Sequence, residues 1–202
     1  MPEAPLPAAS PQLDTLLARA SVPPRNLREP GPGPEAMDRA VAAALRAPDH
    51  GGLRPWRFVC IRGEARVALG RFLAESLAAR EPETPPARLE IEREKPLRAP
   101  LIIVAAAAIR HDRPGVPPWE QEASAAAGTM NLLHALDALG FGTCWLSSGA
   151  LKDPAVKRFL GFAETDTLLG WIYVGTPDAD RPRPARPEPA GFWREWTGLE
   201  TL

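Results

Sequence analysis

Proline is the feature that most constrains how this chain can fold. The 202 residues include 25 prolines, about twice the usual share. Because proline lacks a backbone N–H and fixes φ, helices and central strands rarely continue through it. The prolines gather between the segments with regular apolar spacing, in Met1–Pro34, Pro82–Pro100, Pro114–Pro118 and Pro177–Pro189. This distribution predicts a helical core with long extended arms rather than a disordered chain.

Apolar periodicity between the proline-rich stretches predicts the elements of the core. The expected helices cover residues 11–20, 37–46, 64–80, 87–95, 119–139 and 155–160, and the expected strands cover 56–61, 101–106, 141–146 and 167–174. We expect Val67 to face inward, Leu89 and Ile91 to be the apolar contacts of their helix, and strand 56–61 to be buried on both faces. The helix from Trp119 is small or apolar all round, as is typical of a central helix. Without strict βαβ alternation, the predicted class is α+β, with helices wrapping a small sheet.

The length of 202 residues predicts one domain over residues 1–202, and 45% hydrophobic with 24% charged residues is a globular composition with enough material for a core. The net charge of −1 gives no reason to expect a nucleic-acid partner. Cys60 and Cys144 lie in apolar runs without paired spacing, which predicts buried, inert thiols in a reducing compartment. The N-terminus does not resemble a secretory signal, and the longest apolar run, Leu101–Ile109, is too short to span a bilayer. We therefore expect a cytoplasmic protein without a membrane partner.

The stretch from Arg46 to Phe58 combines stiffness with an unusual set of side chains. Two prolines and two glycines define a tight turn that also carries three arginines, Asp49 and one of only three histidines, His50. Rigid loops on a scaffold often carry binding sites. A helix-to-strand turn with solvated charges would account for the same residues. The residues alone leave both interpretations open.

Other polar groups also have a functional and a structural interpretation. Arg19 and Ser21, at the end of the first helix, could cradle an anion, but an arginine there also interacts favourably with the helix dipole. His134 is expected to be a satisfied core histidine. His111 and Asp112 have no third ligand at metal spacing, so no metal site is predicted.

The chain lacks the motifs of two common enzyme classes. It has no glycine-rich phosphate loop of the GxGxxG or GxxxxGK type. A hydrolase role for Ser147 or Ser148 would need a GxSxG elbow, which is also missing.

Five colinear motifs resemble those of the nitroreductase family, and most closely those of its small single-domain NAD(P)H nitroreductase branch. They are Arg19-Ala20-Ser21, Arg46-Ala47-Pro48-Asp49-His50 with Pro55-Trp56-Arg57-Phe58, the run from Pro118-Trp119-Glu120-Gln121 to Ala125, Gly140-Phe141-Gly142 with Trp145-Leu146-Ser147-Ser148-Gly149-Ala150, and Gly175-Thr176-Pro177. Each motif is weak alone, but their order along roughly residues 13–183 is specific at the family level.

The resemblance implies a fold and an assembly. The fold is a small mixed, mainly antiparallel sheet wrapped by helices. Independently of the resemblance, residues 1–10 are expected to be flexible. The two tryptophans and the phenylalanine near the C-terminus predict that residues 178–202 form an extended arm that packs on the core or on a partner subunit. The assembly is a homodimer that binds two FMN molecules in clefts between the subunits.

The resemblance also implies the residues that bind the cofactor. Arg19, Ser21 and Arg46 would contact the phosphate, ribityl chain or pyrimidine edge of FMN, and His50 would come from the other subunit. The full set is Arg19, Ala20, Ser21, Arg46, His50, Trp145, Leu146, Ser147, Ser148, Gly149, Arg181 and Arg183. Arginine forks match the geometry and charge of a phosphate. Ala126, Gly128 and Gly149 are expected to leave room for the planar ring.

The implied reaction is ping-pong hydride transfer from NAD(P)H through FMN to a nitro compound, a quinone or a related small acceptor. No side chain needs to act as an acid or a base, so no catalytic residue is predicted.

Departures from the family pattern leave other interpretations open. Ala20, Gly51 and Leu146 stand where relatives often carry arginine, lysine or another polar residue. A protein that holds FMN for storage or sensing, without reductase turnover, is one alternative. The second alternative is an interaction module without a cofactor, which binds a different protein through its proline- and tryptophan-rich tail.

Overall fold

The computed structural model describes residues 10–178, 185–196 and 198. Its helices and strands are α1 (Pro11–Ala18), β1 (Leu27–Arg28), α2 (Pro34–Ala44), β2 (Trp56–Arg62), α3 (Glu64–Arg80), α4 (Pro86–Glu94), β3 (Leu101–Ala107), α5 (Pro118–Ala138), β4 (Gly142–Leu146), α6 (Pro154–Phe159) and β5 (Thr167–Pro177). Short 3-10 turns are η1 (Pro24–Asn26), η2 (His50–Gly52), η3 (Lys95–Arg98) and η4 (Gly149–Lys152). The α+β prediction is confirmed, and each longer element lies within a few residues of its expected place.

The five strands form one sheet organised around β5. This strand pairs with β1, β3 and β4, while β2 pairs with the far side of β3. The register places Leu101 opposite Val174 and Trp56 opposite Ala107. Every pairing among the described strands is antiparallel.

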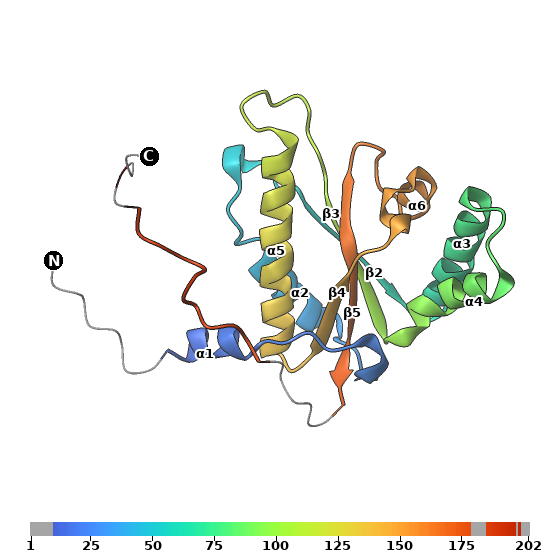
Figure 1. Ribbon diagram of the computed structural model, residues 1–202, viewed down its shortest axis with the longest axis horizontal. Coiled ribbons are helices and arrows are strands. Elements are labelled where there is room, and N and C mark those ends of the chain that lie inside the picture. Colours follow the sequence, from blue (N-terminus) through green and yellow to red (C-terminus); the bar gives the residue numbers. More distant parts are fainter. Residues whose placement is uncertain (1–9, 179–184, 197, 199–202) are drawn as a thin grey trace.

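Helices cover both faces of the sheet, giving three layers (Figure 1). On one face, alternate residues of β3 such as Ile103 pack with α2 and α5. On the other face, the intervening residues, such as Ile102, pack with α3, η4 and α6. All seven residues of β3 are buried, which explains their apolar run.

Gly128 lets α5 approach α2 and β2 closely. A Cβ at this position would lie 2.5 Å from Cδ1 of Trp56 and 3.1 Å from the carbonyl oxygen of Ala44. The space expected for a ligand ring is therefore filled by the Trp56 indole, so the predicted role of Gly128 is wrong.

Several burial predictions are also wrong, each where an element lies at the edge of a layer. Strand β2 is an edge strand and only partly buried, so Cys60 is exposed, while Cys144 is buried as expected. Val67 of α3 and Ile91 of α4 are exposed, at 37% and 42%. Among the described residues, no helix is long and apolar enough to cross a membrane.

Candidate functional site

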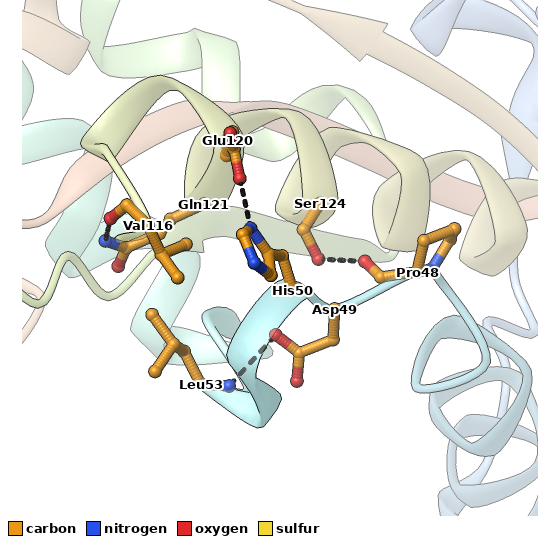
Figure 2. A network of polar contacts seen from close by, with 8 residues as sticks. All are labelled: Pro48, Asp49, His50, Leu53, Val116, Glu120, Gln121 and Ser124. Carbon is orange, nitrogen blue, oxygen red and sulfur yellow. Dashed lines mark hydrogen bonds and ion pairs between the residues drawn. The ribbon is translucent and has the colours of Figure 1, made fainter. Parts of the chain in front are cut away.

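A compact turn connects the end of α2 to β2 and carries the loop singled out in the sequence. The Asp49 carboxylate accepts hydrogen bonds from the backbone N–H groups of Leu53 (3.0 Å) and Arg54 (2.9 Å). Gly51 and Gly52 have φ of 73° and 65°, which glycine adopts without steric cost. Asp49 and the two glycines therefore fix the path of η2, from which His50 projects (Figure 2).

The N-terminal half of α5 holds this turn in place. The Ser124 hydroxyl donates to the carbonyl oxygen of Pro48 (2.6 Å), and the Trp56 indole N–H donates to the carbonyl oxygen of Ser124 (3.0 Å). His50 Nδ1 lies 2.6 Å from Glu120 Oε2 (Figure 2). These contacts join segments about 70 positions apart in the sequence, so the sequence motifs do not show which of their residues meet.

Gln121 stabilises the loop that precedes α5. Its side chain, 2% exposed, accepts from Arg110 N and donates to the carbonyl oxygens of Arg110 and Val116, all within 3.0 Å. Because all three bonds are made to backbone, Gln121 is structural, and it keeps the N-terminus of α5 beside η2 (Figure 2).

A groove of about 320 Å³ opens between the turn and α5. It is lined by Pro48, His50, Trp119, Glu120, Ala123, Ser124 and Ala127. Small apolar side chains form one part of its wall, and the His50–Glu120 pair supplies the polar groups. Such a surface suits a flat, mostly apolar ligand with a few hydrogen-bonding atoms.

The segment expected to line the flavin ring, Trp145 to Gly149, lies at the end of β4. Trp145 donates to the carbonyl oxygen of Leu169 (3.1 Å), and its indole fills the space beside Gly170. Ser148 Oγ accepts from the Trp171 indole (3.1 Å). Trp145 is therefore fixed by packing, while Leu146, Ser147 and Gly149 are exposed.

Leu146, Ser147 and Ser148 line a small pocket of about 80 Å³ on the sheet face covered by α3 and α4. The same pocket contains Lys95, paired with the buried carboxylate of Glu92, and also Arg98. Nothing in the sequence pointed to Glu92 and Lys95, because charged residues on a short helix usually face water. Tyr173 also lines the pocket, and burial raises its pKa to about 12, so it stays neutral at ordinary pH.

A buried polar cluster joins α3 to the start of α6. Asp153 caps α6 by accepting from Ala155 N (2.8 Å), receives a hydrogen bond from Ser76 of α3, and lies 3.0 Å from Arg80 Nε. The Arg80 guanidinium lies against Gly149. Gly149 was expected to leave room for the flavin ring, and the structure places the Arg80 side chain beside it.

Arg19, Ala20 and Ser21 follow the end of α1, where Val22 N donates to the carbonyl oxygen of Thr143 (2.8 Å). Burial and the nearby charge of Arg19 lower the pKa of His134. The buried Nδ1 of His134 has no hydrogen-bond partner among the described residues, so the prediction of a satisfied core histidine is wrong.

The predicted site residues fall into separate regions of one chain. Arg19 lies near His134, while His50 pairs with Glu120, and these two positions on α5 are separated by about 21 Å at 1.5 Å per residue. Arg46 is exposed just beyond α2. Arg181 and Arg183 lie outside the described residues.

Nothing described resembles a metal centre. Within residues 10–178 and the described part of the arm, no three His, Cys, Asp or Glu side chains gather as possible ligands. Asp112 instead forms a bidentate ion pair with Arg110, with N···O distances of 3.0 and 3.2 Å. The hydrogen bonds and the charge of Arg110 hold the pKa of Asp112 below its usual range.

The fold and the loop docked on α5 define a protein of the nitroreductase family. Residues 16–176 match the Nitroreductase family model, and the chain belongs to this family. It is 36% identical over 165 residues to "Putative NAD(P)H nitroreductase YdjA" of Escherichia coli (strain K12), covering 82% of this chain and 87% of the relative. A protein of the same description from Haemophilus influenzae is 32% identical over 152 residues, covering 75% and 82%.

Solved structures share the fold at lower identity. A nitroreductase-like family protein from Bacillus cereus has a TM-score of 0.78 at 20% identity, with 96% of this chain and all of that chain covered. A nitroreductase with bound FMN from Bacteroides fragilis has a TM-score of 0.70 at 18% identity, with 93% and 100% covered.

Proposed function

We propose that the chain is an FMN-dependent NAD(P)H oxidoreductase that reduces nitro compounds, quinones or a related acceptor by ping-pong hydride transfer. The observation that carries the proposal is the family match over residues 16–176, which include every described residue of the groove and the pocket. Relatives named NAD(P)H nitroreductases and a structural neighbour that contains FMN support the same chemistry.

The donor set of the chain fits a phosphorylated flavin. The exposed Arg46, together with Arg19 and Ser21, would hold the phosphate and ribityl chain, because guanidinium groups match phosphate in charge and geometry. Lys95 lies at the pocket beside Leu146, but its charge is already paired with the Glu92 carboxylate, so the unpaired cations among the described residues of the proposed site are the arginines. The pocket beside Lys95 is smaller than a typical ligand site, so the flavin ring would lie outside it. Bound FMN would accept hydride from NAD(P)H and pass it to the acceptor.

The exposed apolar surface of the protomer supports a homodimer as the functional unit. Leu13, Leu16 and Leu17 of α1 are 51%, 48% and 71% exposed, and Trp119 of α5 is 65% exposed. No residue of α1 is buried. Such a set of large apolar side chains, on one amphipathic helix and the rim of the groove, is typical of a surface that a partner covers.

The C-terminal arm is proposed to complete that interface as part of a single-domain chain. Its described residues run outside the body on the side of α1 and α5 (Figure 1). Phe192, Trp193 and Trp196 are 76%, 71% and 73% exposed, so they do not pack on the core of their own chain. Of the two predicted locations for the arm, this favours the partner subunit. A cytoplasmic location stays a prediction.

Turnover tests the proposal directly. Purified protein with added FMN should oxidise NADH or NADPH steadily when a nitroarene or a quinone is present. Tight FMN binding without turnover would favour the alternative in which the protein stores or senses FMN. Leu146 supports that alternative, because it lies at the pocket and replaces a polar residue of the family pattern. A chain that binds no FMN would refute both.

A further inference from the structure

We propose that the small pocket beside η3 binds a carboxylate group of the acceptor molecule, and that Tyr173 and Arg98 recognise that group. The pocket lies on the sheet face covered by α3 and α4, and its volume is about 80 Å³. The choice of the acceptor as the molecule that carries the carboxylate rests on the proposed oxidoreductase function. The carboxylate site itself does not depend on any cofactor.

A buried tyrosine hydroxyl without a partner is the first reason to expect a ligand in this pocket. Tyr173 of β5 is 7% exposed, and its hydroxyl makes no hydrogen bond with any residue that the structure describes. The charges of Arg98 and Glu92 both act on this hydroxyl, so it lies at the charged end of the pocket. Because buried polar groups in folded proteins almost always have a hydrogen-bond partner, the pocket must hold one.

The hydroxyl groups of the pocket are available as donors. Burial raises the pKa of Tyr173 to about 12, so its hydroxyl keeps its proton at ordinary pH. Ser148 Oγ accepts from the Trp171 indole (3.1 Å), which leaves the hydrogen of Ser148 without an acceptor among the described residues. Ser147 lines the same pocket. Hydroxyl donors that face one small volume suit a ligand group that only accepts hydrogen bonds, as a carboxylate does.

The charges around the pocket favour an anionic group over a neutral one. The Glu92 carboxylate is already paired with Lys95 and lies 3.4 Å from Arg88 Nη2, so its charge is neutralised. Arg98 is exposed and has no carboxylate partner within the part of the chain that the structure describes. A guanidinium group matches a carboxylate in charge and geometry. Arg98 therefore adds a positive charge beside the Tyr173 hydroxyl.

The size of the pocket limits what enters it. A water molecule occupies about 30 Å³ in the liquid, so the pocket holds roughly two or three waters or one carboxylate group, but no aromatic ring. The rest of the acceptor would lie outside. Leu146, Ser147 and Ser148 line the pocket and also belong to the segment that the proposed function gives to the flavin ring. The inferred acceptors are thus nitroaromatic compounds or quinones that carry a carboxylate.

NMR of the tyrosine ring tests the carboxylate site directly. Tyr173 is the single tyrosine of the chain, so ring-¹³C-labelled tyrosine reports on this pocket alone. Benzoate added to the purified full chain, with and without FMN, should shift the Tyr173 signals to saturation. Benzamide has the same shape without the charge and should bind at least about tenfold more weakly. No saturable shift in either sample, or equal binding of benzamide, would mean that the pocket holds water only and would overturn the proposal.

Two substitutions identify the groups that recognise the carboxylate, with benzoate affinity measured by calorimetry. Tyr173→Phe should weaken binding about tenfold, and it should not lower stability, because the hydroxyl that it removes has no partner in the fold. Arg98→Gln should weaken binding about three- to tenfold, because an exposed charge contributes less. Arg71→Gln, an exposed arginine of α3 outside the pocket, is the control and should bind like the wild type. Unchanged affinity in Tyr173→Phe or Arg98→Gln would overturn the role of that residue.

Turnover of a matched pair of acceptors tests whether the carboxylate belongs to the acceptor. FMN-loaded protein should reduce 4-nitrobenzoate with a kcat/KM about tenfold higher than that for 4-nitrobenzamide. Arg98→Gln should remove most of this preference by raising KM for 4-nitrobenzoate alone. Benzoate binding without any preference in turnover would overturn the assignment to the acceptor. If the chain binds no FMN, the proposed function fails, while the NMR result still decides whether the pocket binds a carboxylate.

Discussion

Gly128 and Trp56 show how single residues set the distance between the layers beside the groove. The Trp56 indole occupies the space where any other residue at position 128 would place its Cβ, and its N–H bonds to α5 four residues earlier, at Ser124. This packing holds the start of β2, and with it the end of the turn that carries His50.

Gly128→Ala is therefore expected to lower the free energy of unfolding by about 1–3 kcal/mol, the usual cost of overpacking a core. Denaturant unfolding would measure the loss. Gly115→Ala is the control, because a Cβ there meets nothing within 4 Å and should change stability by less than about 0.5 kcal/mol. Equal stability of the two variants would show that the indole moves aside at little cost.

The sequence predicted the chemistry-bearing loop but not the contacts of its residues. The motif at residues 46–58 and the start of α5 were each recognised. The pairing of His50 with Glu120 could not be, because it depends on how two distant segments meet. Glu92 and Lys95 were missed for a related reason: only the packing of α4 and η3 against the sheet brings them to the pocket.

Asp153 links three elements, and its ionisation should affect their stability together. Burial acts to raise the pKa of Asp153, but hydrogen bonds from Ser76 and Ala155 and the charges of Arg80 and Arg158 outweigh it and lower the pKa. A carboxyl whose pKa is lower in the folded state stabilises the fold above its unfolded pKa. That contribution is lost as the pH falls through the folded pKa.

Asp153→Asn should consequently cost about 1–3 kcal/mol at neutral pH, the range for disrupting a buried hydrogen-bonded group. The difference from wild type should shrink as the pH drops below about 3.9, the ordinary aspartate value. Denaturant unfolding at a series of pH values would show this. Asp38→Asn, on the exposed side of α2, is the control and should cost less than about 0.5 kcal/mol at neutral pH. A penalty that does not change with pH would mean that shape, not charge, explains the role of Asp153.

Residues near the start of each helix predict where that helix begins. They do not predict which strand lies at the edge of the sheet or where a very short strand forms. Proline at the first positions of α1, α2, α4, α5 and α6 marks where each helix begins. Strand β1 has only two residues and exists because it pairs with the end of β5, so no sequence window could show it. Strand β2 has an apolar sequence but lies at the sheet edge, which only the topology determines.

For the whole molecule, exposed apolar side chains are the strongest reason to expect a second copy. Helix α1 buries none of its residues, and its leucines face away from the core of the protomer. Helix α1 and the described part of the C-terminal arm lie on the same side of the molecule as α5 (Figure 1).

Changing the apolar face of α1 should thus weaken association without unfolding the chain. Leu16→Glu with Leu17→Glu is expected to convert the dimer to a monomer at micromolar concentration, as measured by light scattering after size-exclusion chromatography. Val67→Glu changes an exposed apolar residue on the opposite layer and should stay dimeric. A wild-type chain that is monomeric at all concentrations would contradict the dimer.

Subunit exchange between Arg19→Ala and His50→Ala tests most directly the central claim that two copies build one flavin site. Each variant alone should bind FMN at least about tenfold more weakly, as expected for loss of one charge-assisted contact. After exchange, mixed dimers hold one intact site and one doubly altered site, so about a quarter of all sites should recover wild-type affinity. Flavin fluorescence titration would count these sites. If no tight site appears in mixtures shown to contain mixed dimers, Arg19 and His50 do not act across the interface, and the account is wrong.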